Sequence, residues 1–188
     1  MKNANPAPIG VFVFGAAAFV IGSLFAGLFG AMNPGNMLMS GIVGILAGVI
    51  LLVVTCLMIS GNSLADSAVF SMWGASIFGY FSLVWTSVGL ILILWKDGVG
   101  VTDPLSFLLL FTCFFSIGYV YYSYKLKIWS FVILFLGVVA GTLSAFAGLY
   151  YGWAQGNQLT GYIFIFLAAM ALYIAFKEQL SAVLPAKE

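Results

Sequence analysis

The stretch that decides the fold is Met37–Ile59, which reads MLMSGIVGILAGVILLVVTCLMI and contains no charged residue. A helix needs about 20 predominantly apolar residues to cross the hydrocarbon core of a bilayer. A membrane-spanning strand would be about 9–11 residues long and would alternate polar with apolar side chains, which this stretch does not do. The stretch therefore predicts a transmembrane helix.

Five further stretches have the same character. The predicted spans are approximately residues 8–31, 37–59, 68–95, 104–124, 128–151 and 159–184. Clusters of Gly, Pro and Asn separate them, as turn chemistry requires; Asn33-Pro34-Gly35-Asn36 is one example. All the connecting loops are short. We therefore expect an all-α integral membrane protein with one domain over residues 1–188, a bundle of six transmembrane helices.

The composition of the whole chain agrees with a bilayer environment. Apolar residues make up 64% of the 188 residues and charged residues 6%, against about 45–50% and 25% in an ordinary soluble domain. A net charge of +1 gives no electrostatic footprint for nucleic acid. The chain has no His, and its two Cys lie in different predicted spans. We therefore expect no enzyme, no cofactor and no metal site.

The lysines predict the orientation of the chain in the membrane. With six spans, both termini lie on the same side. That side holds five lysines and the other side holds Lys96 alone. Cytoplasmic loops carry an excess of Lys and Arg, so both termini are predicted to lie in the cytoplasm, with the chain in the plasma membrane. The five lysines are Lys2, Lys125, Lys127, Lys177 and Lys187.

Small residues recur at four-residue spacing in the first, second, fifth and sixth predicted spans. This pattern is typical of close helix packing in membranes, and lining a pore is the alternative. The residues are Ala18, Gly22, Ala26, Gly30, Ser40, Gly44, Gly48, Gly137, Gly141, Ala145, Ala171 and Ala175.

Polar side chains gather in and before the third span. Ser67 and Ser71 lie one helical turn apart, and their hydroxyls are expected either to line a pore or to hold neighbouring helices together. Trp73 and Tyr80 are seven residues apart, hence on one face. They are candidates for an apolar gate, with an interfacial aromatic belt or bundle core as the alternatives.

Two carboxylates lie near the ends of predicted spans. Asp66 precedes the third span, and Glu178 lies near the end of the sixth beside Lys177. Both are candidates for proton binding at a pore mouth, because burial raises the pKa of a carboxyl group. The alternative is that both are solvated at the membrane surface.

The residues before the first span carry a motif. NPAPIG over residues 5–10 reads as the start of a helix, since proline is tolerated in the first turn and asparagine is a good N-cap. The string resembles the N-P-A-P-[LI]-G signature of the acetate uptake transporter family, the succinate–acetate permeases of bacteria, archaea and fungi. Residues 161–178 resemble the last helix of that family, and residues 61–74 resemble a stretch at its third helix. The motif residues singled out as candidates are Asn5, Pro6, Pro8 and Gly10.

The resemblance implies a function and an assembly. It implies a permease or channel for acetate and possibly succinate or other short carboxylates, and a homo-hexamer with a pore through each protomer. It also implies an apolar constriction in the pore. Carried over by position, the constriction falls on Phe14, Trp73 and Leu136, with Tyr80 as a second candidate for the third span.

The residues themselves also leave other functions open. A carboxylate that enters a pore loses part of its water. Hydrogen bonds could replace that water, from Ser67, Ser71, Asn5 and the backbone donors at the start of the first helix. A pore without Arg would suit a small neutral solute such as urea, a short amide or ammonia at least as well. A membrane scaffold without solute flux is a further alternative.

Overall fold

The computed structural model describes residues 6–30, 33–60, 68–96 and 102–183. These ranges form α1 (Ala7–Phe25), α2 (Pro34–Ser60), α3 (Ala68–Trp95), α4 (Thr102–Lys125), α5 (Trp129–Tyr150) and α6 (Ala154–Val183), and they contain no strand. Every one of these helices is long and apolar enough to cross a bilayer. The predicted all-α, six-span fold is confirmed, and the chain is a multi-pass membrane protein.

The first helix is shorter than predicted. It ends at Phe25, whereas the predicted span reached residue 31. The chain turns out of the helix at Gly27 and Gly30, whose φ angles are +74° and +86°. Glycine adopts this left-handed region without a steric penalty. The 19 residues of α1 are about 28 Å long, which is close to the hydrocarbon thickness of about 30 Å.

The sixth helix begins five residues before its predicted start. Gly156 and Asn157 were expected in the preceding turn, but α6 starts at Ala154 and contains both. The turn is at Gly152, whose φ is +68°. Gly156 is buried against α5, where its carbonyl accepts a hydrogen bond of 2.8 Å from the Ser144 hydroxyl. This glycine therefore serves helix packing and not a turn.

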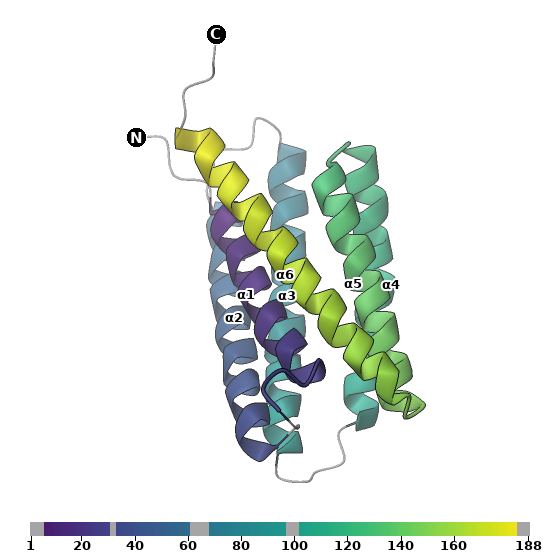
Figure 1. The fold of residues 1–188 in the computed structure, drawn as a ribbon. Helices are drawn as coiled ribbons and strands as arrows, with labels where there is room; N and C mark the ends of the chain where they lie inside the picture. Colours follow the sequence, from purple (N-terminus) through teal and green to yellow (C-terminus); the bar gives the residue numbers. More distant parts are fainter. Residues whose placement is uncertain (1–5, 31–32, 61–67, 97–101, 184–188) are drawn as a thin grey trace.

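The helices form a closed ring. They alternate in direction, and Figure 1 shows the start of α1 and the end of α6 at the same end of the bundle. Each helix contacts the next in sequence, α6 returns to contact α1, and α1 also touches α3 across the ring.

Small residues allow the tightest of these contacts. Gly161 of α6 lies directly against the backbone of Ala26, just beyond α1. Between α2 and α3, a Cβ on Gly89 would lie 2.5 Å from the Gly41 carbonyl oxygen. The Ser82 hydroxyl of α3 donates a hydrogen bond of 2.7 Å to the Gly48 carbonyl of α2. At these positions the small residues and the hydroxyl hold helices together, which is the packing alternative raised by the sequence.

Candidate functional site

Apolar cavities lie inside the ring of helices, and three of them are lined entirely by residues that the structure describes. We name them after one lining residue each: the Trp73 cavity, the Phe131 cavity and the Trp85 cavity. The centres of water-sized molecules can occupy about 20, 10 and 30 Å³ of them, respectively. One water needs about 10–15 Å³ by this measure. Each of these three cavities therefore has room for one or a few waters, and none of the three is an open pore.

The cavities form a file along the ring axis. Ala7, the first residue of α1, lines the Trp73 cavity, and Phe25, its last residue, lines the Trp85 cavity. Neighbouring cavities share walls. Ile77, Phe78 and Phe131 line both the Trp73 and the Phe131 cavities. Phe14 and Phe81 line both the Phe131 and the Trp85 cavities. The file thus covers the length of α1.

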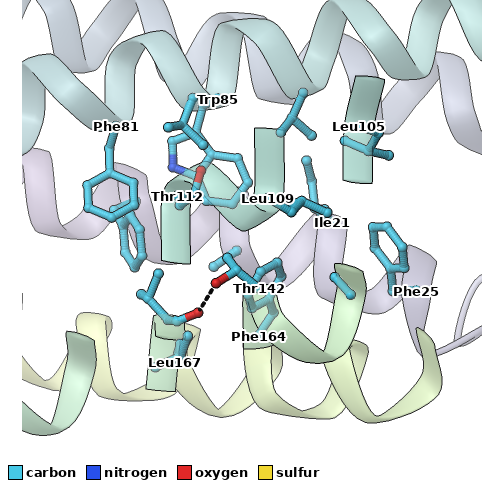
Figure 2. A pocket seen from close by; sticks show the side chains of 16 residues that line it. Ile21, Phe25, Phe81, Trp85, Leu105, Leu109, Thr112, Thr142, Phe164 and Leu167 are labelled. Carbon is cyan, nitrogen blue, oxygen red and sulfur yellow. Dashed lines mark hydrogen bonds between the residues drawn. The ribbon is translucent and has the colours of Figure 1, made fainter. Parts of the chain in front are cut away.

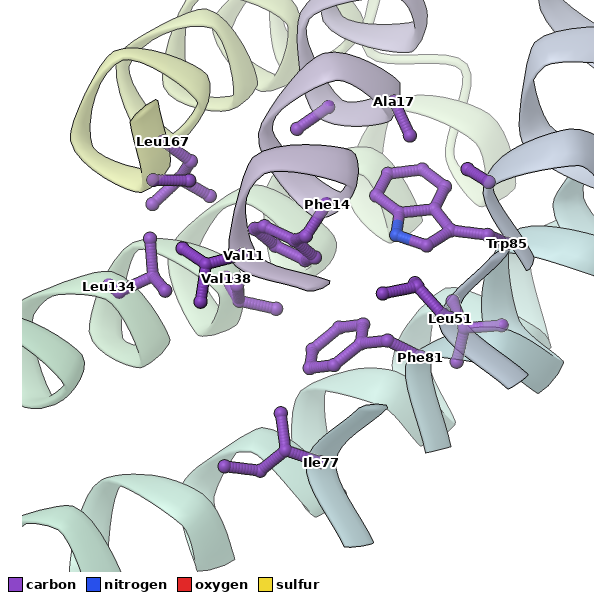
Figure 3. Close-up of a cluster of buried hydrophobic side chains, with 14 of the residues drawn as sticks. Val11, Phe14, Ala17, Leu51, Ile77, Phe81, Trp85, Leu134, Val138 and Leu167 are labelled. Carbon is purple, nitrogen blue, oxygen red and sulfur yellow. The ribbon is translucent and has the colours of Figure 1, made fainter. Parts of the chain in front are cut away.

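Aromatic rings separate the Phe131 cavity from the Trp85 cavity. The rings of Phe14 and Phe81 meet edge to face with their centroids 4.9 Å apart, and Phe14 meets Trp85 at 5.8 Å. Phe81 also stacks against Phe135 of α5, at 6.2 Å. Figure 3 shows Phe14, Phe81 and Trp85 turned toward one another from α1 and α3. An apolar constriction of this kind resists wetting and closes a path to hydrated ions.

The largest of the three, the Trp85 cavity, exposes only apolar atoms in its wall, although three of its lining residues carry polar groups. Figure 2 shows the hydroxyls of Thr112 and Thr142 and the indole of Trp85 around it. The Thr112 hydroxyl donates to the Leu108 carbonyl at 2.8 Å, and the Thr142 hydroxyl donates to the Val138 carbonyl at 2.7 Å. The Trp85 Nε1 donor is buried and has no hydrogen-bond partner. Among the described side chains that line the three cavities, none is charged.

Two of the predicted constriction residues lie on this file. Phe14 is buried between two cavities, and Trp73 is buried in the wall of the cavity at the start of α1. The Trp73 ring meets Phe131 edge to face at 5.1 Å. The two residues do not line the same cavity, so Trp73 does not close the path together with Phe14.

The prediction that Leu136 belongs to the constriction is wrong. Its side chain is 52% exposed on the outer face of the ring, and it lines none of the three cavities. The inner face of α5 follows helical periodicity. It carries Phe131, Leu134, Phe135 and Val138, at spacings of three and four residues. Leu136 falls on another face of the helix, which transfer by sequence position did not take into account.

The structure places Tyr80 between α3 and α4. Its half-buried ring points to α4, where it stacks on Phe115 at 4.9 Å and lies 6.1 Å from the Tyr119 ring. It lines none of the three cavities. The Tyr119 hydroxyl donates to the Ser76 carbonyl of α3 at 3.1 Å. These aromatic residues join α3 to α4.

The N-terminal motif shapes the start of α1. Pro6 occupies the N-cap and its carbonyl accepts from Ile9 N at 3.1 Å, while Pro8 lies in the first turn. Asn5, the predicted N-cap, lies outside the described residues. Gly10 has a clear packing role, because a Cβ there would lie 2.6 Å from the Phe78 ring. The small Gly10 of the motif therefore allows the Phe78 ring to pack against α1. Phe78 lines two of the cavities.

The polar candidates remain predictions. Asp66 and Ser67 lie outside the residues that the structure describes. Ser71 lies in α3 and Glu178 in α6, but neither side chain is among those described.

Phe14 lines the Trp85 cavity as well, but the sequence did not indicate four other residues of its wall, which are Phe81, Trp85, Thr112 and Thr142. Phe81 and Trp85 are four residues apart, and they continue the inner face of α3 that begins with Ile77 and Phe78. This periodic aromatic face was the available signal. Thr112 and Thr142 gave no such signal, because a single threonine in an apolar helix marks no particular face.

Comparison with solved structures gives a likeness over the whole length of the chain. No family model matches the chain, and no curated protein matches it. A solved structure described as the bacterial acetate channel SatP superposes with a TM-score of 0.78 over 99% of this chain and 100% of that one, at 21% sequence identity. This likeness establishes that the two chains share a fold along their whole length, and it agrees with the family resemblance of the NPAPIG motif.

Proposed function

We propose that this protein is a channel or permease for acetate and other short carboxylates such as succinate, with a route inside each protomer. The observation that carries the proposal is the file of cavities enclosed by the six helices, which covers the length of α1. The fold that the chain shares with a bacterial acetate channel supports it. So does the family resemblance of the NPAPIG motif at residues 5–10.

The Phe14–Phe81 contact acts as the barrier of this route. Moving a bare carboxylate into a low-dielectric medium costs on the order of 20 kcal/mol by the Born estimate. The phenyl rings of Phe14 and Phe81 have no hydrogen-bond donor, so neither can replace the water that a carboxylate loses there. A small weak acid meets this requirement by crossing in neutral form or with brief desolvation, whereas a hydrated metal ion does not. In this proposal the rings move apart for passage and exclude ions when closed.

A channel for a small neutral solute is the second candidate. The observation that favours it is the absence of charged groups among the described side chains of the cavity walls. Urea, a short amide or ammonia would cross such walls at a lower desolvation cost than an anion.

We further propose a homo-hexamer in the plasma membrane with both termini in the cytoplasm. The family resemblance supports the hexamer. The lysines support the orientation, because Lys125 and Lys177 lie near the ends of helices that finish on the side of the termini, while Lys96 follows α3 on the other side. Native mass spectrometry of the purified protein measures the oligomer number. A C-terminal reporter that is active only in the cytoplasm checks the orientation.

The test of the proposed function is uptake of radiolabelled acetate into proteoliposomes, with and without an inward proton gradient. Protein-free liposomes give the passive leak of acetic acid, which is subtracted. We expect protein-dependent uptake that unlabelled propionate competes with and urea does not. Dependence on the gradient would indicate proton coupling. Uptake equal to the leak would refute the acetate proposal, and flux of urea alone would establish the neutral-solute channel.

A further inference from the structure

The wall of the Trp85 cavity offers water no hydrogen-bond partner. Only apolar atoms are exposed in it, and the hydroxyls of Thr112 and Thr142 donate to carbonyls of their own helices. A buried water makes about two to four hydrogen bonds. The centres of water-sized molecules can occupy about 30 Å³ of this cavity, whereas one water needs about 10–15 Å³ by the same measure. The size of the cavity therefore admits water, but the chemistry of its wall disfavours it.

Two helix contacts beside the cavity are already as close as the backbone allows, so these helices cannot move inward to fill the space. A Cβ on Gly22 of α1 would lie 2.9 Å from the Gly161 carbonyl oxygen of α6. A Cβ on Gly141 of α5 would lie 2.6 Å from the ring of Phe164, which lines the cavity. Atoms that line a void lose the dispersion energy of the contacts that they do not make. A nonpolar occupant would restore these contacts.

We propose that the Trp85 cavity is a binding site for a small, uncharged, nonpolar molecule that dissolves in the bilayer, and that an occupant blocks the solute route. A charged or strongly polar ligand is excluded, because no exposed group of the wall replaces its water. The binding site is argued from the wall alone, whereas the block rests on the proposed function. Phe14 and Phe81 both line the cavity. An occupant therefore lies against both rings and fills space that they need in order to part.

Xenon is a suitable probe of the site, because this polarisable atom binds in dry apolar cavities. In crystals of the full-length protein under xenon pressure, each bound atom gives an anomalous-scattering peak. We expect a peak in the Trp85 cavity, in contact with Leu109 and Val138. We expect none in the Phe131 cavity, which has only about 10 Å³ by the same measure. A Trp85 cavity without a xenon peak would overturn the binding site.

A side chain that fills the cavity should imitate the occupant. Val138 of α5 is buried and lines this cavity but neither of the other two, and Leu143 of the same helix is 49% exposed. We expect Val138→Phe to lose the xenon peak and to lower protein-dependent acetate uptake several-fold. Leu143→Phe is the matched control and should keep the wild-type peak and uptake. Val138→Leu adds one methylene and provides a milder variant. If neither Val138 variant folds, the xenon experiments on the wild-type protein decide.

Acetate uptake by wild-type proteoliposomes under xenon tests the block directly. Argon at the same pressure is the control, because it is smaller and less polarisable and should bind more weakly. Protein-free liposomes under each gas give the leak. We expect xenon to lower protein-dependent uptake several-fold and argon to change it less. A xenon peak with unchanged uptake would overturn the block and leave the binding site. Uptake equal to the leak without any gas would refute the proposed function and the block with it, and the xenon peak alone would then decide the binding site.

Discussion

The rings of Phe14 and Phe81 meet edge to face at 4.9 Å and divide the interior of the bundle into two parts. The Phe131 cavity lies on one side and the Trp85 cavity on the other. Both residues are buried, and they come from α1 and α3, which touch across the ring. In our account this contact limits the passage of solute, and the packing of the helices around it holds it in place.

Two leucines of α5 distinguish the inner face from the outer face. Leu134 is buried in the wall of the Phe131 cavity, whereas Leu136 is exposed on the outside. We expect Leu134→Ala to enlarge the route and to raise acetate flux or admit longer acids. Leu136→Ala should leave both properties at the wild-type level. Uptake of acetate and butyrate into proteoliposomes checks this pair, and the reverse ranking would restore Leu136 to the constriction.

The close contact between α1 and α6 should depend on glycine. Gly161 lies against the backbone of Ala26, so a side chain there must push the helices apart. We expect Gly161→Val to lower the free energy of unfolding by about 1–3 kcal/mol or more, the usual cost of overpacking. Thermal unfolding in detergent measures the change. Gly118 of α4 has nothing within 4 Å of an added Cβ, so Gly118→Ala should be neutral or stabilising by up to about 1 kcal/mol.

The hydroxyl of Ser82 should contribute to the packing of α3 on α2. It donates to the Gly48 carbonyl at 2.7 Å and is buried. Ser82→Ala should cost about 0.6 kcal/mol, the average for hydrogen bonds between membrane helices. Ser76 of the same helix instead donates to its own backbone, at the Trp73 carbonyl. Ser76→Ala should therefore have a smaller effect, and equal losses in thermal unfolding would argue against the α2–α3 hydrogen bond.

The sequence was sufficient to predict the number and type of the helices, because hydrocarbon thickness sets the length of an apolar run. It located helix ends less well. Gly156 was read as a turn residue, but tertiary contact with Ser144 keeps it inside α6. A glycine in a membrane helix serves close packing as readily as it serves a turn, and only the position of the neighbouring helix distinguishes the two.

The candidate site was predicted in part. Phe14 follows the NPAPIG motif closely enough for its position to be inferred, and it lies on the cavity file. Leu136 was transferred by position without regard to the helical face, and its outward orientation follows from the periodicity of α5. Trp85 was not singled out, because its role depends on an enclosed cavity that five helices form together.

The most direct test of the central claim compares acetate uptake by the wild-type protein, Phe14→Ala and Phe19→Ala. Phe14 is buried at the constriction, and Phe19 of the same helix is 47% exposed on its outer face. Loss of a buried phenylalanine side chain costs about 3–5 kcal/mol of stability, so Phe14→Leu provides a milder second variant. We predict that Phe14→Ala raises protein-dependent acetate flux several-fold and that Phe19→Ala leaves it unchanged. Wild-type flux in folded Phe14→Ala and Phe14→Leu proteins would contradict a route past this residue.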